Sequence, residues 1–374
     1  MNHRDQPQDA AFRAEVQAWL RTHVPKQLAS GDTAEGFAQH LEWERQLFEA
    51  GYAVVSWPKA YGGREASLRQ WLIFEEEYYR AGGPQRVTQN GIFLLAPTLF
   101  EFGTQSQKDC ILPAMAGAQT LWAQAWSEPG AGSDLAAVRS KAERVDGGWR
   151  LYGQKTWCTR AAFCDACFGL FRSDPTSERH RGLTYFMAPL TGEGVDVRGF
   201  GRLDGDEGFA EVFFDGLFVS DDAVIGGVGD GWKVAMATTS SERGLTLRSP
   251  GRFIAASQRL NALNAERQSS PQIDQRCLDV ALKAEAYRVF TDAAVAAMEQ
   301  GDDLGSRSSL MKVFWSELDI DLHETALALL ADHAALESDW MKGYQFSLAG
   351  PIYAGTNEIQ RQIIAERLLG LPRR

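Results

Sequence analysis

The sequence predicts an α+β multidomain protein in which a helical region, a compact β-domain and a helical bundle follow one another. Three observations predict this order: apolar residues at helical spacing early in the chain, short aromatic-rich segments in its middle, and long helical periods after them. We place the three regions at residues 1–117, 118–228 and 229–374. At 374 residues the chain is longer than one hydrophobic core usually supports, which also favours several domains.

The first region is expected to be mainly helical. Its three helical stretches are residues 9–25, 36–50 and 68–83. In the first of them Phe12, Val16 and Leu20 recur at helical spacing. The third ends at a glycine pair, which is a common signal for the end of a helix.

The middle region carries short segments typical of strands, separated by Gly, Asp or Ser. They are WRLYGQKTW, CFGLFRS, LTYFMAPL, VDVRGF and EVFFDGLFV. The last segment contains Asp215 and Gly216, a dipeptide common in hairpin turns, although a bulge within one continuous strand also accommodates it. Both interpretations stay open at the level of the sequence.

Helical periodicity returns after residue 229. Apolar residues recur every four positions at Leu310, Phe314, Leu318, Leu322 and Ala326. The segment LDVALKAEAYRVFTDAAVAAMEQ is a second long amphipathic stretch. These two stretches predict a C-terminal helical bundle.

The bulk composition excludes several classes of function. A net charge of −11 argues against nucleic acid or an anionic membrane surface as a partner, although an anionic small molecule can still bind through local basic residues. No apolar run approaches the roughly 18–20 residues of a membrane span, and the polar N-terminus carries no visible secretory signal. We therefore expect a cytoplasmic protein.

The cysteines do not predict a disulfide framework or a metal site. Five is an odd number in a long chain. Cys164 and Cys167 form a C-x-x-C motif, but a zinc site needs a second pair of ligands and a redox site needs a helix N-terminus beside the first thiol. Neither is apparent in the sequence, so we interpret the motif as incidental.

The run SEPGAGSD, from Ser127 to Asp134, raises the question of function. Pro129 restricts the backbone, while Gly130 and Gly132 permit close approaches that a Cβ forbids. Such a run is either an ordinary loop or a loop whose backbone lies against a ligand. A dinucleotide-binding Rossmann motif is excluded, because the run reads G-x-G-x-x-L and lacks alternating strands and helices around it.

Together with GQKTW and the C-terminal AGTNEIQRQIIAERLLGLPR, this run closely resembles the acyl-CoA dehydrogenase family of flavoproteins. The resemblance extends from about residue 8 to the C-terminus and preserves the order and spacing of the motifs. It implies an N-terminal helical domain, a middle β-barrel and a C-terminal four-helix bundle, with FAD bound where they meet.

The resemblance also implies a set of cofactor-binding residues. They are Trp126, Ser127, Gly132, Ser133, Trp157, Thr159, Gly355, Thr356 and Glu358. Trp126 and Ser127 correspond to groups that hydrogen-bond the flavin pyrimidine edge, and Ser133 to one that touches the cofactor phosphate or the pantetheine arm of the substrate. The Trp157 indole is expected to pack against the isoalloxazine.

Thr159 is expected to hydrogen-bond near flavin N5. The C-terminal GTNEI turn, with Gly355, Thr356 and Glu358, is expected to contact the diphosphate or the adenosine end of FAD. Glu358 lies four residues after Ala354, so it should point away from the reacting carbon.

The reaction that the resemblance implies is α,β-dehydrogenation of an acyl-CoA thioester. A carboxylate removes the pro-R α-proton while the β-hydride passes to flavin N5, and the developing enolate must be stabilised. Many family members carry this glutamate where this chain has Ala354, and others carry it at the position of Glu242, directly before Arg243. Because a small residue accompanies the second arrangement, Glu242 is the expected base.

The backbone N–H of Ala354, with a flavin ribityl hydroxyl, is expected to hold the enolate oxygen. Arg243 either orients Glu242 or meets the CoA, and Glu128 is expected to be a structural acid inside the loop. The expected partners are an acyl-CoA substrate and an electron-transferring flavoprotein as electron acceptor.

Two family motifs are missing, Arg-x-x-Phe-Gly and Gln-x-x-Gly-Gly-x-Gly, which puts cofactor contacts across subunits in doubt. Shortened motifs of this kind resemble a bacterial branch that acts on bulky, branched or steroid-derived acyl-CoA thioesters in β-oxidation-like catabolism. Some of these enzymes pair two chains, so we expect a homotetramer or a heterotetramer with a related chain. The alternatives are a non-catalytic subunit of such a heteromer and a related flavin oxidase or monooxygenase.

Overall fold

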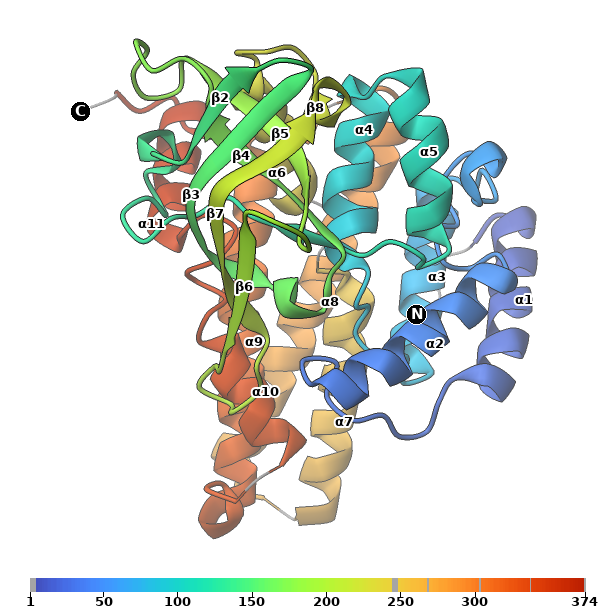
Figure 1. The fold of residues 1–374 in the computed structure, drawn as a ribbon. Coiled ribbons are helices and arrows are strands. Elements are labelled where there is room, and N and C mark those ends of the chain that lie inside the picture. The colour runs from blue at the N-terminus through green and yellow to red at the C-terminus, as the bar shows by residue number, and fades with distance from the viewer. Residues whose placement is uncertain (1–4, 244–247, 268, 303, 337, 373–374) are drawn as a thin grey trace. The chain divides into compact units, whose positions relative to one another are not determined.

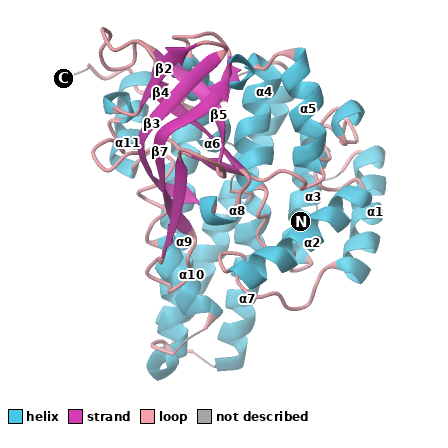
Figure 2. Ribbon diagram, viewed as in Figure 1, coloured by secondary structure: helices cyan, strands magenta, loops and turns pink. Residues whose placement is uncertain are grey.

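The computed structural model describes residues 5–243, 248–267, 269–302, 304–336 and 338–372. These residues divide into two compact units. The helical unit comprises Met1–Lys26, Ala66–Pro84 and Arg243–Arg374, and the sheet unit comprises Gln27–Glu65 and Gln85–Glu242. Figure 1 labels the elements of both units, and Figure 2 distinguishes their helices from their strands.

The helical unit is built on long antiparallel helices. Its helices are α1 (Pro7–His23), α3 (Leu68–Arg80), α7 (Pro250–Arg267), α8 (Pro271–Glu299), α9 (Arg307–Leu330), α10 (Asp339–Ser347) and α11 (Asn357–Ile363). Helices α7, α8 and α9 pack side by side, α3 packs on α7, and both α10 and α11 pack on α9. A capping box of Ser67 and Gln70 begins α3, and the Thr356 hydroxyl caps α11.

The predicted four-residue stripe of α9 is confirmed in part. Leu318, Leu322 and Ala326 are buried, whereas Phe314 is 37 % exposed and stacks on Tyr287. The buried face of α9 also includes polar residues, which an apolar pattern does not predict. These are Ser308, Ser309, Lys312, Ser316, Asp319 and Thr325.

The sheet unit combines helices with one eight-stranded sheet. Its α-helices are α2 (Ala34–Glu49), α4 (Ala96–Phe102), α5 (Gln105–Ala116) and α6 (Gly231–Arg243). Its strands are β1 (Trp122–Gln124), β2 (Lys141–Val145), β3 (Gly148–Thr159), β4 (Ala166–Arg172), β5 (Leu183–Pro189), β6 (Val195–Phe200), β7 (Phe209–Ser220) and β8 (Val224–Ile225). The strand order is β6-β7-β3-β2-β4-β5-β8, and β1 pairs in parallel with β4.

The Asp215–Gly216 dipeptide lies within strand β7 and forms no hairpin turn. In the pairing of β3 with β7, Leu151 faces Leu217 and Tyr152 faces Asp215, so Gly216 is an extra residue. Its φ of 80° is one that glycine adopts without strain. The bulge interpretation is therefore correct and the hairpin interpretation is wrong.

The C-x-x-C thiols lie inside the sheet unit. Burial raises the pKa of Cys164 to about 12, and the pKa of Cys167 is raised well above its ordinary value for the same reason. Both thiols are therefore protonated at neutral pH. Within the described ranges, no cluster of three or more His, Cys, Asp or Glu side chains is arranged to hold a metal ion.

The predicted fold class is confirmed: helices come first, a sheet follows, and helices end the chain. The predicted boundaries of the regions stay a prediction. The helices of the first region are divided between the two units, with α1 and α3 in the helical unit and α2, α4 and α5 in the sheet unit. No helix among the described residues is both long enough and apolar enough to cross a bilayer.

Candidate active site

The SEPGAGSD run forms a closed turn in the sheet unit. The Glu128 N–H donates to the Ala131 carbonyl at 3.0 Å, and the Ala131 N–H donates back to Glu128 at the same distance. Pro129 and Gly130 stand at the exposed tip of this turn. The turn is therefore a defined structure and not an irregular loop.

A fully buried lysine of the sheet unit hydrogen-bonds to this turn from the protein interior. The Nζ of Lys155, on strand β3, donates to Glu128 Oε1 at 2.8 Å, to the Leu170 carbonyl at 2.8 Å and to the Trp126 carbonyl at 3.3 Å. An ammonium group has three N–H donors, and each of them has an acceptor here. The charge is thus both paired and fully hydrogen-bonded.

Glu128 is the structural acid of the turn. Besides Lys155 it accepts the backbone N–H groups of Arg139 at 2.7 Å and Ser140 at 2.9 Å. Burial by itself raises the pKa of this carboxyl, but the Lys155 charge and the hydrogen bonds outweigh burial and hold the pKa below the ordinary value of 4.5. Burial lowers the pKa of Lys155, and the Glu128 carboxylate offsets part of that effect.

Trp157 projects from a bulge in strand β3. Its φ is 60°, a left-handed conformation that disfavours residues with a Cβ, and the pairing of β3 with β7 is interrupted between Lys155 and Cys158. The indole is 60 % exposed. Phe200 and Phe209 contact the indole edge-on, at 5.3 and 5.7 Å between ring centres, so this exposed ring is held in one orientation.

The bulge and the turn are joined by the backbone. The Thr156 N–H donates to the Ser127 carbonyl at 2.9 Å. At the end of β3, the half-buried Thr159 accepts a hydrogen bond from the Asn90 side chain at its carbonyl, at 3.3 Å. The structure thus brings Trp126, Ser127, Trp157 and Thr159 into one part of the sheet unit.

The turn also presents unused hydrogen-bond donors. Five backbone N–H groups of this segment donate to no acceptor among the described residues. They are those of Trp126, Ser127, Gly130, Gly132 and Ser133. The buried indole Nε1 of Trp126 likewise has no partner in the described part of the chain. A Cβ built on Gly130 or Gly132 meets nothing within 4 Å, so neither glycine is required by packing.

The second group of predicted site residues lies in the helical unit. Ala354 has a φ of 55° and Gly355 a φ of 79°, so the chain turns sharply just before α11. Considering only the described residues, the Ala354 N–H donates to no protein acceptor. Glu358, in the first turn of α11, is exposed.

The predicted base lies at the end of the sheet unit. Glu242 and Arg243 are the last two residues of α6. Their side chains are outside the described part of the structure, as are residues 244–247. Their roles, like those of the other site residues, stay predictions.

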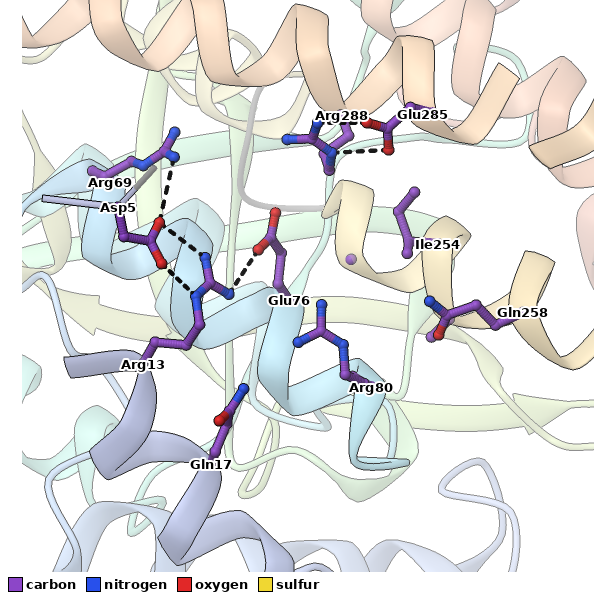
Figure 3. A pocket seen from close by; sticks show the side chains of 12 residues that line it. Asp5, Arg13, Gln17, Arg69, Glu76, Arg80, Ile254, Gln258, Glu285 and Arg288 are labelled. Atoms are coloured by element: carbon purple, nitrogen blue, oxygen red, sulfur yellow. Dashed lines mark hydrogen bonds and ion pairs between the residues drawn. The ribbon is translucent and has the colours of Figure 1, made fainter. Parts of the chain in front are cut away.

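The helical unit also contains a charged cavity of about 350 Å³. Figure 3 shows its side chains, and none of the predicted site residues lines it. Arg13 pairs with Asp5 at 2.7 Å and with Glu76 at 3.0 Å, and Arg288 pairs with Glu285 at 2.5 Å. Since acids neutralise these arginines, the cavity offers little attraction to an anionic ligand.

Sequence reasoning missed two buried lysines, Lys155 and Lys312. Lys155 stands four residues from the buried Leu151 on the same strand, and alternation places both on one face. Lys312 stands three residues before the buried Trp315 on α9. In each case the spacing is the signal, but a lysine is ordinarily assigned to the solvent.

Replacing Glu128 with Gln should destabilise the protein by about 3 kcal/mol at pH 7, because Lys155 loses the charge that compensates its burial. The pKa of Glu128 is lowered in the folded state, so its contribution is complete above pH 4.5 and disappears as the pH falls through that lowered pKa. Chemical denaturation at pH 7 and at pH 3 measures this difference. Glu143→Gln, which removes an exposed partner of Lys141, is the control and should cost under about 1 kcal/mol. A Glu128→Gln effect that does not depend on pH would contradict the assignment.

Three consecutive parts of the chain match the three domains of one protein family. They are the N-terminal domain of acyl-CoA dehydrogenase over residues 6–119, the middle domain over residues 123–217 and the C-terminal domain over residues 229–369.

Named relatives support the same family, and solved structures share the fold. Acyl-CoA dehydrogenase IpdE1 from Mycobacterium tuberculosis is 36% identical over 376 residues, and that from Mycolicibacterium smegmatis is 37% identical over 389 residues, each alignment covering 97% of both chains. The structure described as Tcur3481-Tcur3483 steroid ACAD has a TM-score of 0.90 at 24% identity, and the alignment covers 100% of both chains. The crystal structure of the ChsE4-ChsE5 complex from Mycobacterium tuberculosis has a TM-score of 0.86 at 25% identity, again with 100% of both chains covered. The predicted enzyme class is therefore confirmed, and this chain belongs to the acyl-CoA dehydrogenase family.

Proposed function

We propose that this protein catalyses α,β-dehydrogenation of a bulky, branched or steroid-derived acyl-CoA thioester, with Glu242 as the base. The observation that carries the proposal is the turn from Trp126 to Ser133. Five of its amides, those of Trp126, Ser127, Gly130, Gly132 and Ser133, donate to no described protein acceptor, and Gly130 and Gly132 serve no packing purpose among the described residues. Family membership supports the reaction type, and the combination of Glu242 with Ala354 supports the substrate class.

The residues of the sheet unit suit a flavin as the cofactor. The Trp126 and Ser127 amides and the Trp126 indole N–H are donors without protein acceptors in the described chain, as hydrogen bonding to a flavin edge requires. The exposed indole of Trp157, held by two phenylalanines, offers a flat apolar surface on which an aromatic ring system packs. When bound, FAD supplies the acceptor for the β-hydride of the substrate.

The residues of the chain then have separate tasks. Glu242 removes the α-proton and holds it on its carboxyl group. The Ala354 N–H donates to the thioester carbonyl, whose oxygen becomes more negative as the α-proton leaves. Ser133 and Arg243 assist in binding the CoA part, while Gly355, Thr356 and Glu358 contact the cofactor diphosphate or adenosine.

An electron-transferring flavoprotein is the proposed electron acceptor, and the cytoplasm is the proposed location. The acyl group is best identified with a panel of short, branched, long, cyclic and steroid CoA thioesters, assayed with an artificial electron acceptor. A flavin oxidase would differ by rapid reoxidation of its reduced flavin by O₂ in stopped-flow measurements.

A heteromeric assembly is the proposed quaternary structure. The missing Arg-x-x-Phe-Gly motif favours it, and two similar structures are described by pairs of chain names, Tcur3481-Tcur3483 and ChsE4-ChsE5. We expect the chain purified alone to hold less than one flavin per chain and to gain turnover on co-expression with a related partner. Flavin absorbance together with native mass spectrometry measures both properties. A homotetramer with full flavin content and full turnover would contradict the heteromer.

Glu242→Gln should lower kcat by about four orders of magnitude while binding of FAD and of acyl-CoA persists, because an amide cannot accept the α-proton. Steady-state turnover, flavin content and thioester binding by titration separate these effects. The exposed Glu143→Gln variant serves as the control and should retain wild-type kcat. A loss smaller than tenfold for Glu242→Gln would mean that another residue is the base.

Gly132→Ala should weaken FAD or thioester binding by about tenfold or more, because the added methyl group occupies space that the ligand needs. The same change should leave the unfolding free energy of the flavin-free protein within about 1 kcal/mol of wild type, since the methyl meets no protein atom. Isothermal titration and chemical denaturation test the two parts. Gly201→Ala, at another open glycine of the sheet unit, is the matched control and should change neither. Unchanged ligand affinity in Gly132→Ala would contradict the contact.

A further inference from the structure

The turn that carries Ala354 is held in an unfavourable backbone conformation. Ala354 is not a glycine, yet its φ is 55°, and the left-handed conformation continues at Gly355 with a φ of 79°. Such a conformation persists only where surrounding contacts enforce it. The contacts that enforce it here come from two buried polar side chains at the start of α11.

Gln360 holds the turn through its carbonyl groups. Its side-chain amide donates to the Ala354 carbonyl at 3.1 Å and to the Gly355 carbonyl at 3.4 Å. Gln360 is fully buried, so water does not compete with these bonds. The orientation of the peptide planes on either side of Gly355 is thereby restricted.

Asn357 closes the turn from the other end. Its backbone N–H donates to the Pro351 carbonyl at 2.8 Å, which spans the Ala354–Gly355 segment. Its side-chain carbonyl accepts the Lys312 ammonium at 2.7 Å and the Ser316 hydroxyl at 3.1 Å, both from helix α9. Two hydrogen bonds from α9 therefore meet at one atom of the turn, Asn357 Oδ1.

The burial of Lys312 carries a cost in desolvation free energy. Its side chain is fully buried, and its ammonium lies 5.9 Å from the centre of the Trp315 ring. Burying an ammonium group costs desolvation energy that an apolar side chain of similar length does not incur. If this position contributed only to the packing of α9 on α11, Met or Leu would stabilise that packing more than Lys does.

The residue before Ala354 is also held by a buried cation. Arg248 donates from Nη2 to the Tyr353 hydroxyl at 2.6 Å, and its guanidinium lies 5.4 Å from the centres of the Trp315 and Tyr353 rings. The segment from Tyr353 to Asn357 is thus fixed at both ends by cations that solvent does not reach.

We propose that Lys312 is a positioning residue for the reaction: by holding Asn357, it keeps the Ala354 N–H directed at the thioester carbonyl. The proposal rests on the proposed function, in which this N–H stabilises the enolate oxygen. Lys312 itself touches neither substrate nor cofactor in this scheme. It acts through the side chain of Asn357 and the backbone of the turn.

The test compares the flavin-loaded wild type, co-expressed with its partner chain where turnover requires one, with Lys312→Met in the same assembly; this change keeps the length of the side chain and removes its charge. The probe is acetoacetyl-CoA, whose α-protons are acidic enough for the enolate to be followed by absorbance as the pH is varied. A well-placed hydrogen-bond donor at the carbonyl lowers the apparent pKa of the bound probe. We expect Lys312→Met to raise that apparent pKa by about one unit or more, because a displaced donor stabilises the enolate less.

Turnover should show the same defect. With the thioester that wild type oxidises fastest, kcat should fall about 10- to 100-fold while KM changes less than about threefold. Ser316→Ala removes the other donor to Asn357 with little change in volume, and it should shift the probe pKa in the same direction by a smaller amount. This second variant keeps the test decisive where Lys312→Met does not fold.

Lys283→Met is the matched control. Lys283 is an exposed lysine on α8 that pairs with Asp321, and its replacement should change neither the probe pKa nor kcat. A wild-type-like probe pKa in Lys312→Met, or in Ser316→Ala where Lys312→Met does not fold, would overturn the positioning role. A wild type that neither enolises the probe nor oxidises any thioester would instead overturn the proposed function, so the two failures are distinguishable.

Discussion

The three hydrogen bonds of the Lys155 ammonium are the constraint on which the turn from Ser127 to Asp134 depends. They tie the carbonyls of Trp126 and Leu170 and the carboxylate of Glu128 to one buried point. A buried charge tolerates little displacement of its partners, because a lost carbonyl leaves an unsatisfied N–H donor and a lost carboxylate leaves an uncompensated charge in a medium of low dielectric constant. The turn above this point can therefore expose its amides to a ligand and still keep a defined shape.

The helical unit uses a second buried lysine in a related way. Lys312 holds the side chain of Asn357, as Lys155 holds that of Glu128, and in each case the neighbouring residues have backbone donors that no described protein group accepts. The two arrangements differ in the group that accepts the hydrogen bond: Lys155 donates to a carboxylate, and Lys312 donates to the side-chain oxygen of Asn357.

The sequence predicted the parts of this protein that follow from periodicity and from special backbone residues. The helix–sheet–helix order came from apolar spacing, and the bulge at Gly216 was one of two outcomes that Asp-Gly allows. The division of the first helices between two units was not predictable, since it depends on which helix faces pack together over long sequence separations. Lys155 and Lys312 were missed for a physical reason: a lysine is buried only where several acceptors converge, and that convergence is a property of the folded chain.

The geometry at Ala354 explains how different family members can carry the catalytic carboxylate at either of two positions. Two tasks are assigned to this position in the family, a base carried by the side chain and a hydrogen-bond donor carried by the backbone. The contacts of Gln360 and Asn357 hold the backbone without using the Ala354 side chain at all. The direction of this N–H is therefore independent of which residue stands there, provided that the residue tolerates a φ of 55°. In the proposed reaction, where Glu242 supplies the carboxylate from another element, a small side chain at 354 is sufficient, and the space that a glutamate would occupy is released. A bulky acyl group is the kind of substrate that benefits from that space.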